Sequence, residues 1–151
     1  MILLKSLESE FAGREENNMD SSCKIAVIVV VYNKSCKESI TCQALKALRH
    51  TKVSVLVYDN SVRDFGNASY CEKQEWIYFS QGENVGISKA YNVCVDHLKK
   101  YMLADYLCLF DDDTNISEEY FDTLNSAING YDADIYAVSY THLRAHETLS
   151  D

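Results

Sequence analysis

The chain of 151 residues has no proline, no CxxC pair among its six cysteines and no excess of positive charge. With 14 Lys and Arg against 23 Asp and Glu, its formal net charge is −9. This balance argues against a partner with a nucleic-acid backbone, because such binders present clustered basic side chains. Cysteines without paired spacing do not support a zinc site and favour free thiols in a reducing compartment.

Long apolar runs are also missing. The longest, Ile25 to Tyr32, has eight residues, far short of the roughly 20 that cross a bilayer. Acidic residues follow the first apolar residues too soon for a secretory signal. We therefore expect no transmembrane segment and a cytoplasmic location, either free or peripheral at the inner face of the membrane.

The two ends differ in character from the centre. Residues 1–22 carry polar and acidic clusters without periodicity and are predicted to be a flexible leader. Residues 138–148, VSYTHLRAHET, resemble one reading frame of a transposase-type sequencing adaptor, so we interpret residues 138–151 as a non-native tail. An ordinary polar C-terminal segment is the alternative. His142 and His146 lie in this segment and lack a third metal ligand. Residues 23–137 remain as one truncated folded domain.

The centre alternates between strand and helix patterns. Buried strands are expected from β-branched apolar runs, and Ser35 with Glu38 and Ser117 form helix-start signals. The expected strands are 24–32, 53–58, 76–79, 106–110 and the beginning of a fifth at 134–137; the expected helices are 35–49, 87–98 and 117–130, with a polar loop at 61–75. Such alternation predicts an α/β protein, a three-layer sandwich around a mostly parallel sheet with right-handed crossovers.

Polar residues follow three of the expected strands directly. Asn33, Asp59 and the triplet Asp111–Asp113 each stand where a strand ends. Because parallel strands place their carboxyl ends along one edge, these distant residues are predicted to converge on a single crevice, where ligands of such sheets bind.

The triplet suggests a cation. In extended backbone, Asp111 and Asp113 project to the same side. Two hard oxygen ligands with open positions suit Mg²⁺ or Mn²⁺ that also holds substrate phosphates. The alternative is a solvated acidic turn before the helix at Ser117, where carboxylates favour the positive helix end.

Two further segments could contact a nucleotide. Asp59 and Asn60 could accept hydrogen bonds from a pyrimidine N–H or ribose hydroxyls, although Asp-Asn-Ser is also good turn chemistry. Asn84 to Gly86, with Lys89 in the next turn, could offer free N–H groups to an anion or could be a plain helix start.

A third candidate pair follows the first strand. Tyr32 and Asn33 could flank a base, and Tyr32 could equally be a packing residue.

Four segments in order resemble the family-two glycosyltransferases of the GT-A fold: VIVVVYN at 27–33, VLVYDNS at 55–61, ENVGISKAYNVCV at 83–95 and YLCLFDDDT at 106–114. They span nearly all of the expected domain. The N-x-G-x-x-x-A-x-N pattern at 84–92 is most similar to the rhamnosyltransferase-type branch. That branch often has Asp-Gln-Asp where this chain has Asp112 in the middle.

The resemblance implies a role for each predicted residue. Asp59 would contact the base, Asp111 or Asp112 the ribose, and Asp113 would ligate a divalent ion that bridges the diphosphate. Asn33 and residues 84–89 would line the same pocket. The implied donor is a UDP- or dTDP-linked sugar, the acceptor a glycan or lipid-linked hydroxyl, and the process polysaccharide biosynthesis.

The family's general base is a carboxylate that follows the DxD strand, in the acceptor-binding half. No position in this chain matches it. Glu118 and Glu119 occupy the first turn of a helix and are better explained by the helix dipole. The resemblance therefore implies a donor-binding half without catalytic residues, inactive alone.

Four other interpretations stay open. A nucleotidyltransferase shares the architecture but usually has a glycine-rich basic loop after the first strand, whereas residues 33–37 contain no glycine. A receiver-like signalling module would carry its acidic pair there. A phosphatase of the haloacid dehalogenase type would have D-x-D-x-T, whereas Thr114 comes one residue too early. A purely structural α/β domain is the remaining alternative.

Overall fold

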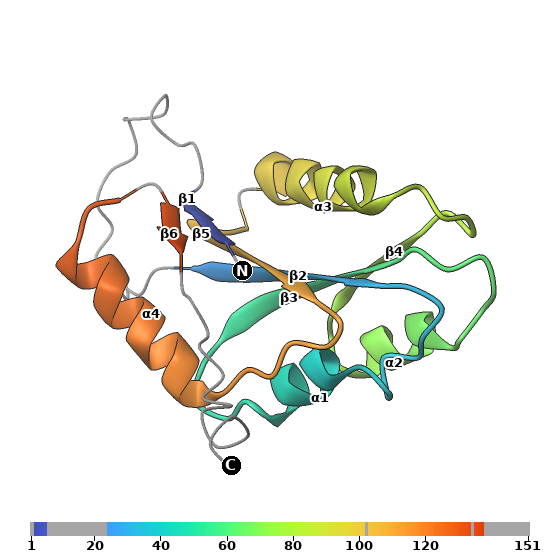
Figure 1. Ribbon diagram of the computed structural model, residues 1–151, viewed down its shortest axis with the longest axis horizontal. Coiled ribbons are helices and arrows are strands. Elements are labelled where there is room, and N and C mark those ends of the chain that lie inside the picture. The colour runs from blue at the N-terminus through green and yellow to red at the C-terminus, as the bar shows by residue number, and fades with distance from the viewer. Residues whose placement is uncertain (1, 6–23, 102, 134, 138–151) are drawn as a thin grey trace, which may run out of the picture.

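The computed structural model describes residues 2–5, 24–101, 103–133 and 135–137. One sheet has the strand order β4-β3-β2-β5-β1-β6 (Figure 1). The strands are β1 (Ile2–Lys5), β2 (Ile25–Val31), β3 (Val53–Asp59), β4 (Ile77–Ser80), β5 (Tyr106–Asp111) and β6 (Ile135–Ala137). β4, β3, β2 and β5 are parallel neighbours, whereas β1 is antiparallel to both β5 and β6. The predicted mostly parallel sheet is confirmed.

Four helices accompany the described strands. They are α1 (Ile40–Ala47), α2 (Asn67–Lys73), α3 (Ile87–Tyr101) and α4 (Glu118–Gly130). Ser117 caps α4 as predicted, since its side chain accepts a hydrogen bond from the N–H of Tyr120. Within the described residues, no helix combines the length and apolar character needed to cross a bilayer.

The molecule has three layers, as expected (Figure 1). Successive side chains of a strand point to opposite faces, and all seven residues of β2 are buried. On one face of the sheet, every second residue of β2 packs with α1, α2 and α4; these residues are Ile25, Val27, Val29 and Val31. Ala26, Ile28 and Val30 pack with α3 on the other. The β-branched run therefore serves two cores at once, which is why it shows no polar alternation.

The N-terminal prediction needs a correction. Ile2–Lys5 form β1 and pair with β5 from Ile2↔Leu109 to Lys5↔Tyr106, so these four residues are not a flexible leader. Four residues are too few to show a period, but their backbone groups complete the ladder of β5. Residues 6–23 and 138–151 lie outside the described residues, so the rest of the leader and the tail interpretation stay predictions.

The start of the first helix also differs from the prediction. Ser35 and Glu38 do interact, with the Ser35 N–H donating to Glu38 Oε2 at 3.2 Å, but they close a turn before the helix. The helix starts at Ile40 because Ser39 is its N-cap and accepts from the N–H of Cys42 at 3.1 Å. The signal was therefore real but stood one turn too early.

The expected polar loop at 61–75 contains a helix. α2 follows Gly66, whose φ of 74° lies in the left-handed region that favours glycine. Tyr70 and Cys71 bury its inner side. With two apolar anchors in seven residues, this helix depends on tertiary packing more than on a periodic pattern.

The cysteines of the described residues are free, as predicted, and all of them are also buried: Cys36, Cys42, Cys71, Cys94 and Cys108. Burial raises the pKa of Cys94 and of Cys108 to about 12. These thiols therefore stay protonated at neutral pH and act as small apolar core groups.

Candidate functional site

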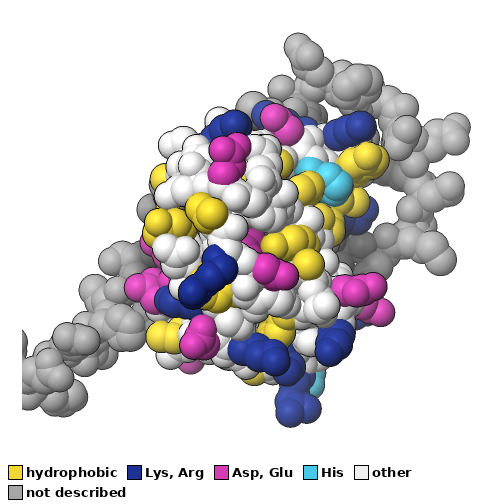
Figure 2. Space-filling view, turned by 90° about the vertical axis from the view of Figure 1, so that its right-hand side faces the viewer, with side chains coloured by type: hydrophobic (Ala, Val, Ile, Leu, Met, Phe, Trp, Pro, Cys, Tyr) yellow, Lys and Arg dark blue, Asp and Glu magenta, His cyan; other side chains and the backbone are white. Residues whose placement is uncertain are grey.

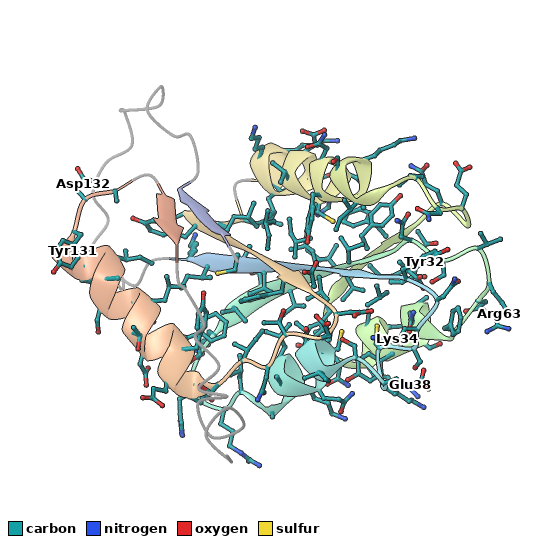
Figure 3. All side chains as sticks on the ribbon, viewed as in Figure 1. Tyr32, Lys34, Glu38, Arg63, Tyr131 and Asp132 are labelled. Carbon is teal, nitrogen blue, oxygen red and sulfur yellow. The ribbon has the colours of Figure 1, made fainter. Side chains whose placement is uncertain are left out.

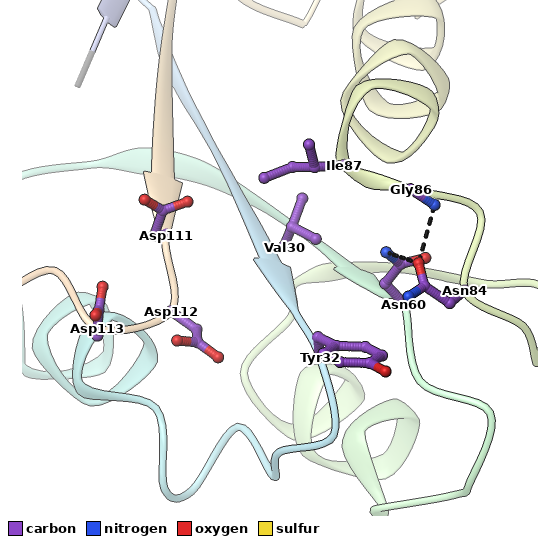
Figure 4. Close-up of a pocket in the computed structure, with 9 residues that line it drawn as sticks. All are labelled: Val30, Tyr32, Asn60, Asn84, Gly86, Ile87, Asp111, Asp112 and Asp113. Atoms are coloured by element: carbon purple, nitrogen blue, oxygen red, sulfur yellow. Dashed lines mark hydrogen bonds between the residues drawn. The ribbon is translucent and has the colours of Figure 1, made fainter.

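A cavity of about 460 Å³ lies at the carboxyl edge of the parallel strands (Figure 4). The three aspartates form one wall and two asparagines with a glycine the other, and Tyr32 lies between them. Its lining is Val30, Tyr32, Asn60, Asn84, Gly86, Ile87, Asp111, Asp112 and Asp113. A volume of this order suits a small organic ligand.

Strand register explains why distant residues meet here. Val31 at the end of β2 pairs with Asp59 of β3, and Val30 pairs with Asp111 of β5. Two strand spacings separate β3 from β5, which is roughly 10 Å. Asp59 and the aspartate triplet therefore lie at one edge of the sheet, but they line two neighbouring cavities and not the single crevice that was predicted.

The three aspartates differ in their surroundings. Oδ1 of Asp112 lies 3.0 Å from the ammonium nitrogen of Lys34, in a half-exposed ion pair. Asp111 and Asp113 are exposed, and their carboxylates form no hydrogen bond or ion pair with any residue that the structure describes. Burial and the nearby charge of Asp111 raise the pKa of Tyr91 to about 12, so this phenol is neutral. Two carboxylates at the cavity thus remain open to a ligand.

These open carboxylates fit a divalent cation. Among the described residues, no three His, Cys, Asp or Glu side chains form a complete metal site. Mg²⁺, however, commonly takes only one or two carboxylates and completes its shell with substrate phosphates and water. Asp111 and Asp113 are the residues that could hold such an ion.

The opposite wall is an amide network. Asn60 Nδ2 donates to Asn84 Oδ1 at 2.8 Å, and Asn60 Oδ1 accepts from the N–H of Val85 at 2.8 Å. The N–H of Gly86 donates to Asn84 Oδ1 at 3.0 Å (Figure 4), and the φ of Gly86 is 81°. Side-chain oxygens already accept from the N–H groups of Val85 and Gly86, so these two groups are not free, and the alternative of a plain helix start is favoured.

Asp59 is held more deeply than expected. It is 3% exposed; its Oδ1 accepts from the N–H of Ser61 at 3.1 Å. Its Oδ2 accepts from Asn67 Nδ2 at 2.8 Å and from the Tyr78 hydroxyl at 3.2 Å. Asp59 does not line the larger cavity but a neighbouring one of about 240 Å³, together with Tyr78 and Arg63. Burial and this carboxylate raise the pKa of Tyr78 to about 12, which keeps it a donor.

The remaining predicted residues lie around the rim. Tyr32 is 50% exposed and lines the cavity, which removes the alternative of a packing role. Asn33 is exposed, has a φ of 48° and donates its N–H to Ser61 Oγ at 2.8 Å. Lys89 is exposed in the first turn of α3. Neither Asn33 nor Lys89 lines the larger cavity, so their roles stay predictions.

Two residues of this region, Asn67 and Ile87, were missed. Asn67 is fully buried and also donates to the carbonyl of Lys34 at 3.0 Å and accepts from the N–H of Cys36 at 2.7 Å. In the sequence it lies within an expected polar loop, and no pattern there distinguishes it from the other polar residues. Ile87, the first residue of α3, is 50% exposed and lines the cavity with Val30.

The loops of the site gather at one end of the molecule. Figure 3 shows Tyr32, Lys34 and Arg63 beyond the carboxyl ends of the strands, whereas Tyr131 lies at the opposite end. Figure 2 faces this edge and shows acidic and basic side chains interspersed there. On this face the charges do not form the continuous basic surface that a nucleic-acid backbone requires.

The three layers, the parallel strands and the crevice at their carboxyl edge define an α/β protein whose cavity lies where ligands of such sheets bind. The sequence model of "Glycosyl transferase family 2" matches residues 26–148, and the chain belongs to this family. The matched range extends through residues 138–148, whose interpretation as adaptor sequence stays a prediction. The family resemblance carried by the four motifs is confirmed.

Individual relatives agree with this assignment. The chain is 32% identical over 133 residues to glycosyltransferase GlyA of Streptococcus pneumoniae, an alignment that covers 83% of this chain and 18% of GlyA. Among solved structures, S. aureus TarS has a TM-score of 0.52 at 24% identity, covering 70% of this chain and 19% of TarS. The 1–349 segment of TarS in complex with UDP has a TM-score of 0.53 at 21% identity, covering 70% and 32% respectively. The chain thus spans less than a third of each of these relatives.

Proposed function

We propose that this chain binds the donor of a glycosyl transfer, a sugar linked to UDP or dTDP, with Mg²⁺ or Mn²⁺ held by Asp111 and Asp113. The carrying observation is the cavity in which these two unpaired carboxylates face the wall of Asn60 and Asn84. A cation between the carboxylates and an anionic diphosphate makes its binding to an acidic site much more favourable than binding without the cation. When bound, the cation offsets the charge of the diphosphate and stabilises it as a leaving group.

In this proposal the other residues of the site contact different parts of the nucleotide. Tyr32 offers an exposed aromatic face at the cavity, and Asn60 and Asn84 offer amide groups to ribose hydroxyls. Asp59 retains acceptor capacity for a pyrimidine N–H in the neighbouring cavity. Asn33 and Lys89 flank these cavities. The TarS structure in complex with UDP supports a uridine nucleotide as the first ligand to test.

For the whole reaction we propose inverting transfer of a hexosyl or rhamnosyl group to a glycan or lipid-linked hydroxyl, in cytoplasmic polysaccharide biosynthesis. Family membership supports the transfer. Glu118 does not serve as the general base, because its carboxylate accepts from the N–H groups of Arg49, His50 and Thr51. In this proposal the chain contributes donor binding, and no catalytic residue is assigned within it.

Thermal unfolding with different ligands tests the proposal. We expect Mn²⁺ with UDP or dTDP to stabilise the chain, by about 2.7 kcal/mol at a ligand concentration 100 times Kd. Mn²⁺ alone, UDP in EDTA, Mn²⁺ with ATP and acetyl phosphate are the comparisons. Equal stabilisation by ATP would favour a nucleotidyltransferase, and no response to any nucleotide would contradict donor binding.

A further inference from the structure

Two hydroxyl groups hold the turn that carries Asp111–Asp113: that of Thr41, in the first turn of α1, and that of Ser39, the N-cap of α1. Thr41 Oγ1 donates to the carbonyl of Asp111 and accepts from the N–H of Thr114 at 2.8 Å. Ser39 Oγ donates to the carbonyl of Asp112 at 2.8 Å. These contacts join residues 70 and 73 positions apart in the chain. The hydroxyl of Thr41 thus connects Asp111, at the start of the aspartate turn, to Thr114, directly after it.

Both side chains are fully buried, so water does not compete for these bonds. A hydroxyl has one proton to donate and two lone pairs to accept with. Ser39 uses a lone pair for the N–H of Cys42, as any helix cap does, and its proton for Asp112. A helical threonine can bond a carbonyl of its own preceding turn or point to solvent. Thr41 instead bonds the aspartate turn, which neither capping nor helix formation requires.

We propose that Ser39 and Thr41 are positioning residues that fix the backbone of Asp111 and Asp112, so that the open carboxylates are preorganised for the cation and diphosphate. This inference rests on the proposed function. The physical basis is that groups fixed before binding lose little conformational freedom on binding, whereas a loose turn must be ordered by the ligand. Because the hydroxyls touch only the backbone of the turn, they act through it and not on the ligand.

The test compares Thr41→Val, which keeps the shape but removes the hydroxyl, with Thr41→Ser, which keeps the hydroxyl. Thr51→Val is the matched control, because the Thr51 hydroxyl bonds Glu118, at the N-terminus of α4, 2.5 Å away. Calorimetry on the full chain measures UDP binding in saturating Mn²⁺ and in EDTA, and thermal unfolding of each variant reports its fold. Changing the partner of a metal ligand typically weakens metal binding by 10- to 100-fold.

We expect Thr41→Val to weaken Mn²⁺-dependent UDP binding by about 10-fold, with binding in EDTA unchanged. Thr41→Ser and Thr51→Val should stay within about twofold of the wild type. If Thr41→Val does not fold, Ser39→Ala against Ser39→Thr makes the same comparison at Asp112. Wild-type affinity in a folded Thr41→Val or Ser39→Ala variant overturns the inference alone. Absence of Mn²⁺-dependent UDP binding in the wild type overturns the proposed function and the inference together.

Discussion

The ammonium nitrogen of Lys34 lies 3.0 Å from Oδ1 of Asp112, the middle residue of the aspartate triplet. The carbonyl of the same lysine accepts a hydrogen bond from the buried Asn67, whose amide also donates to Asp59. The loop after β2 is therefore anchored on both sides, to the carboxylate that lines the larger cavity and to the one that lines the smaller. One of the three negative charges is compensated within the protein, and two are left for a cation.

Replacing Lys34 should change ligand binding more than stability. A half-exposed ion pair contributes about 1 kcal/mol or less to stability. The free energy of unfolding of Lys34→Gln should therefore differ from that of the wild type by no more than this amount. The site, however, gains an uncompensated carboxylate that repels the diphosphate. We expect UDP binding in EDTA to weaken several-fold, measured by calorimetry. Lys37→Gln, in the same loop and exposed, is the control, and an equal effect there would refute the argument.

Asp113→Asn tests the cation directly. The exchange keeps the shape of the side chain but removes a charged oxygen ligand. We expect Mn²⁺-dependent binding of UDP to fall by more than about 10-fold, since even altering the partner of a ligand has that effect. Asp122→Asn, an exposed position on α4, removes the same charge far from the cavity and should leave binding unchanged. If both variants bind UDP and Mn²⁺ like the wild type, Asp113 is not a ligand.

Asn67→Ala should be strongly destabilising. The change removes a buried side chain with three hydrogen bonds and leaves the buried carboxylate of Asp59 without one of its donors. We expect a loss of about 2 to 4 kcal/mol in urea unfolding, because unpaired buried polar and charged groups are costly. Asn92→Ala, exposed on α3, should change stability by no more than about 0.5 kcal/mol. A similarly small loss of unfolding free energy in Asn67→Ala would show that the hydrogen bonds of this amide do not stabilise the fold.

Glu118 provides a pH-dependent prediction. The Thr51 hydroxyl and the backbone N–H groups of Arg49, His50 and Thr51 bond its carboxylate and lower its pKa from 4.5 to about 2. A carboxyl whose pKa is lower in the folded state stabilises the fold above its unfolded pKa, and this contribution disappears as the pH falls through the folded value. At pH 7 the melting temperature of the wild type should therefore be higher than that of Glu118→Gln. This difference in melting temperature should disappear as the pH falls from about 4.5 to 2.

The control for this pH profile is Glu119→Gln, the exposed neighbour in the same helical turn. It should show no comparable convergence with the wild type at low pH. A constant gap between wild type and Glu118→Gln from pH 7 to pH 2 would mean that the carboxylate is not held as the structure has it.

The sheet and its functional edge could be predicted because β2 is short, β-branched and buried on both faces, and because polar residues stand directly after it and its neighbours. Such signals are local in sequence. The edge then follows from the parallel arrangement alone, which brings Asp59 and Asp111 to either side of β2.

The errors arose where tertiary contacts decide local structure. The start of α1 is set at Ser39 by its cap and by the aspartate turn over 70 residues away, neither of which Ser35 and Glu38 reveal. α2 depends on burial of Tyr70 and Cys71. The partners of Asp59 come from α2 and β4, so the sequence could not distinguish an open ligand from a deeply bonded carboxylate.

The most direct measurement is anomalous scattering from Mn²⁺ in a crystal grown with UDP. We predict one strong peak within about 2.0–2.5 Å of carboxylate oxygens of Asp111 or Asp113, bridged to the diphosphate, with the pyrimidine beside Asp59. UDP bound elsewhere on the molecule, or a peak that none of the three aspartates contacts, would contradict this prediction.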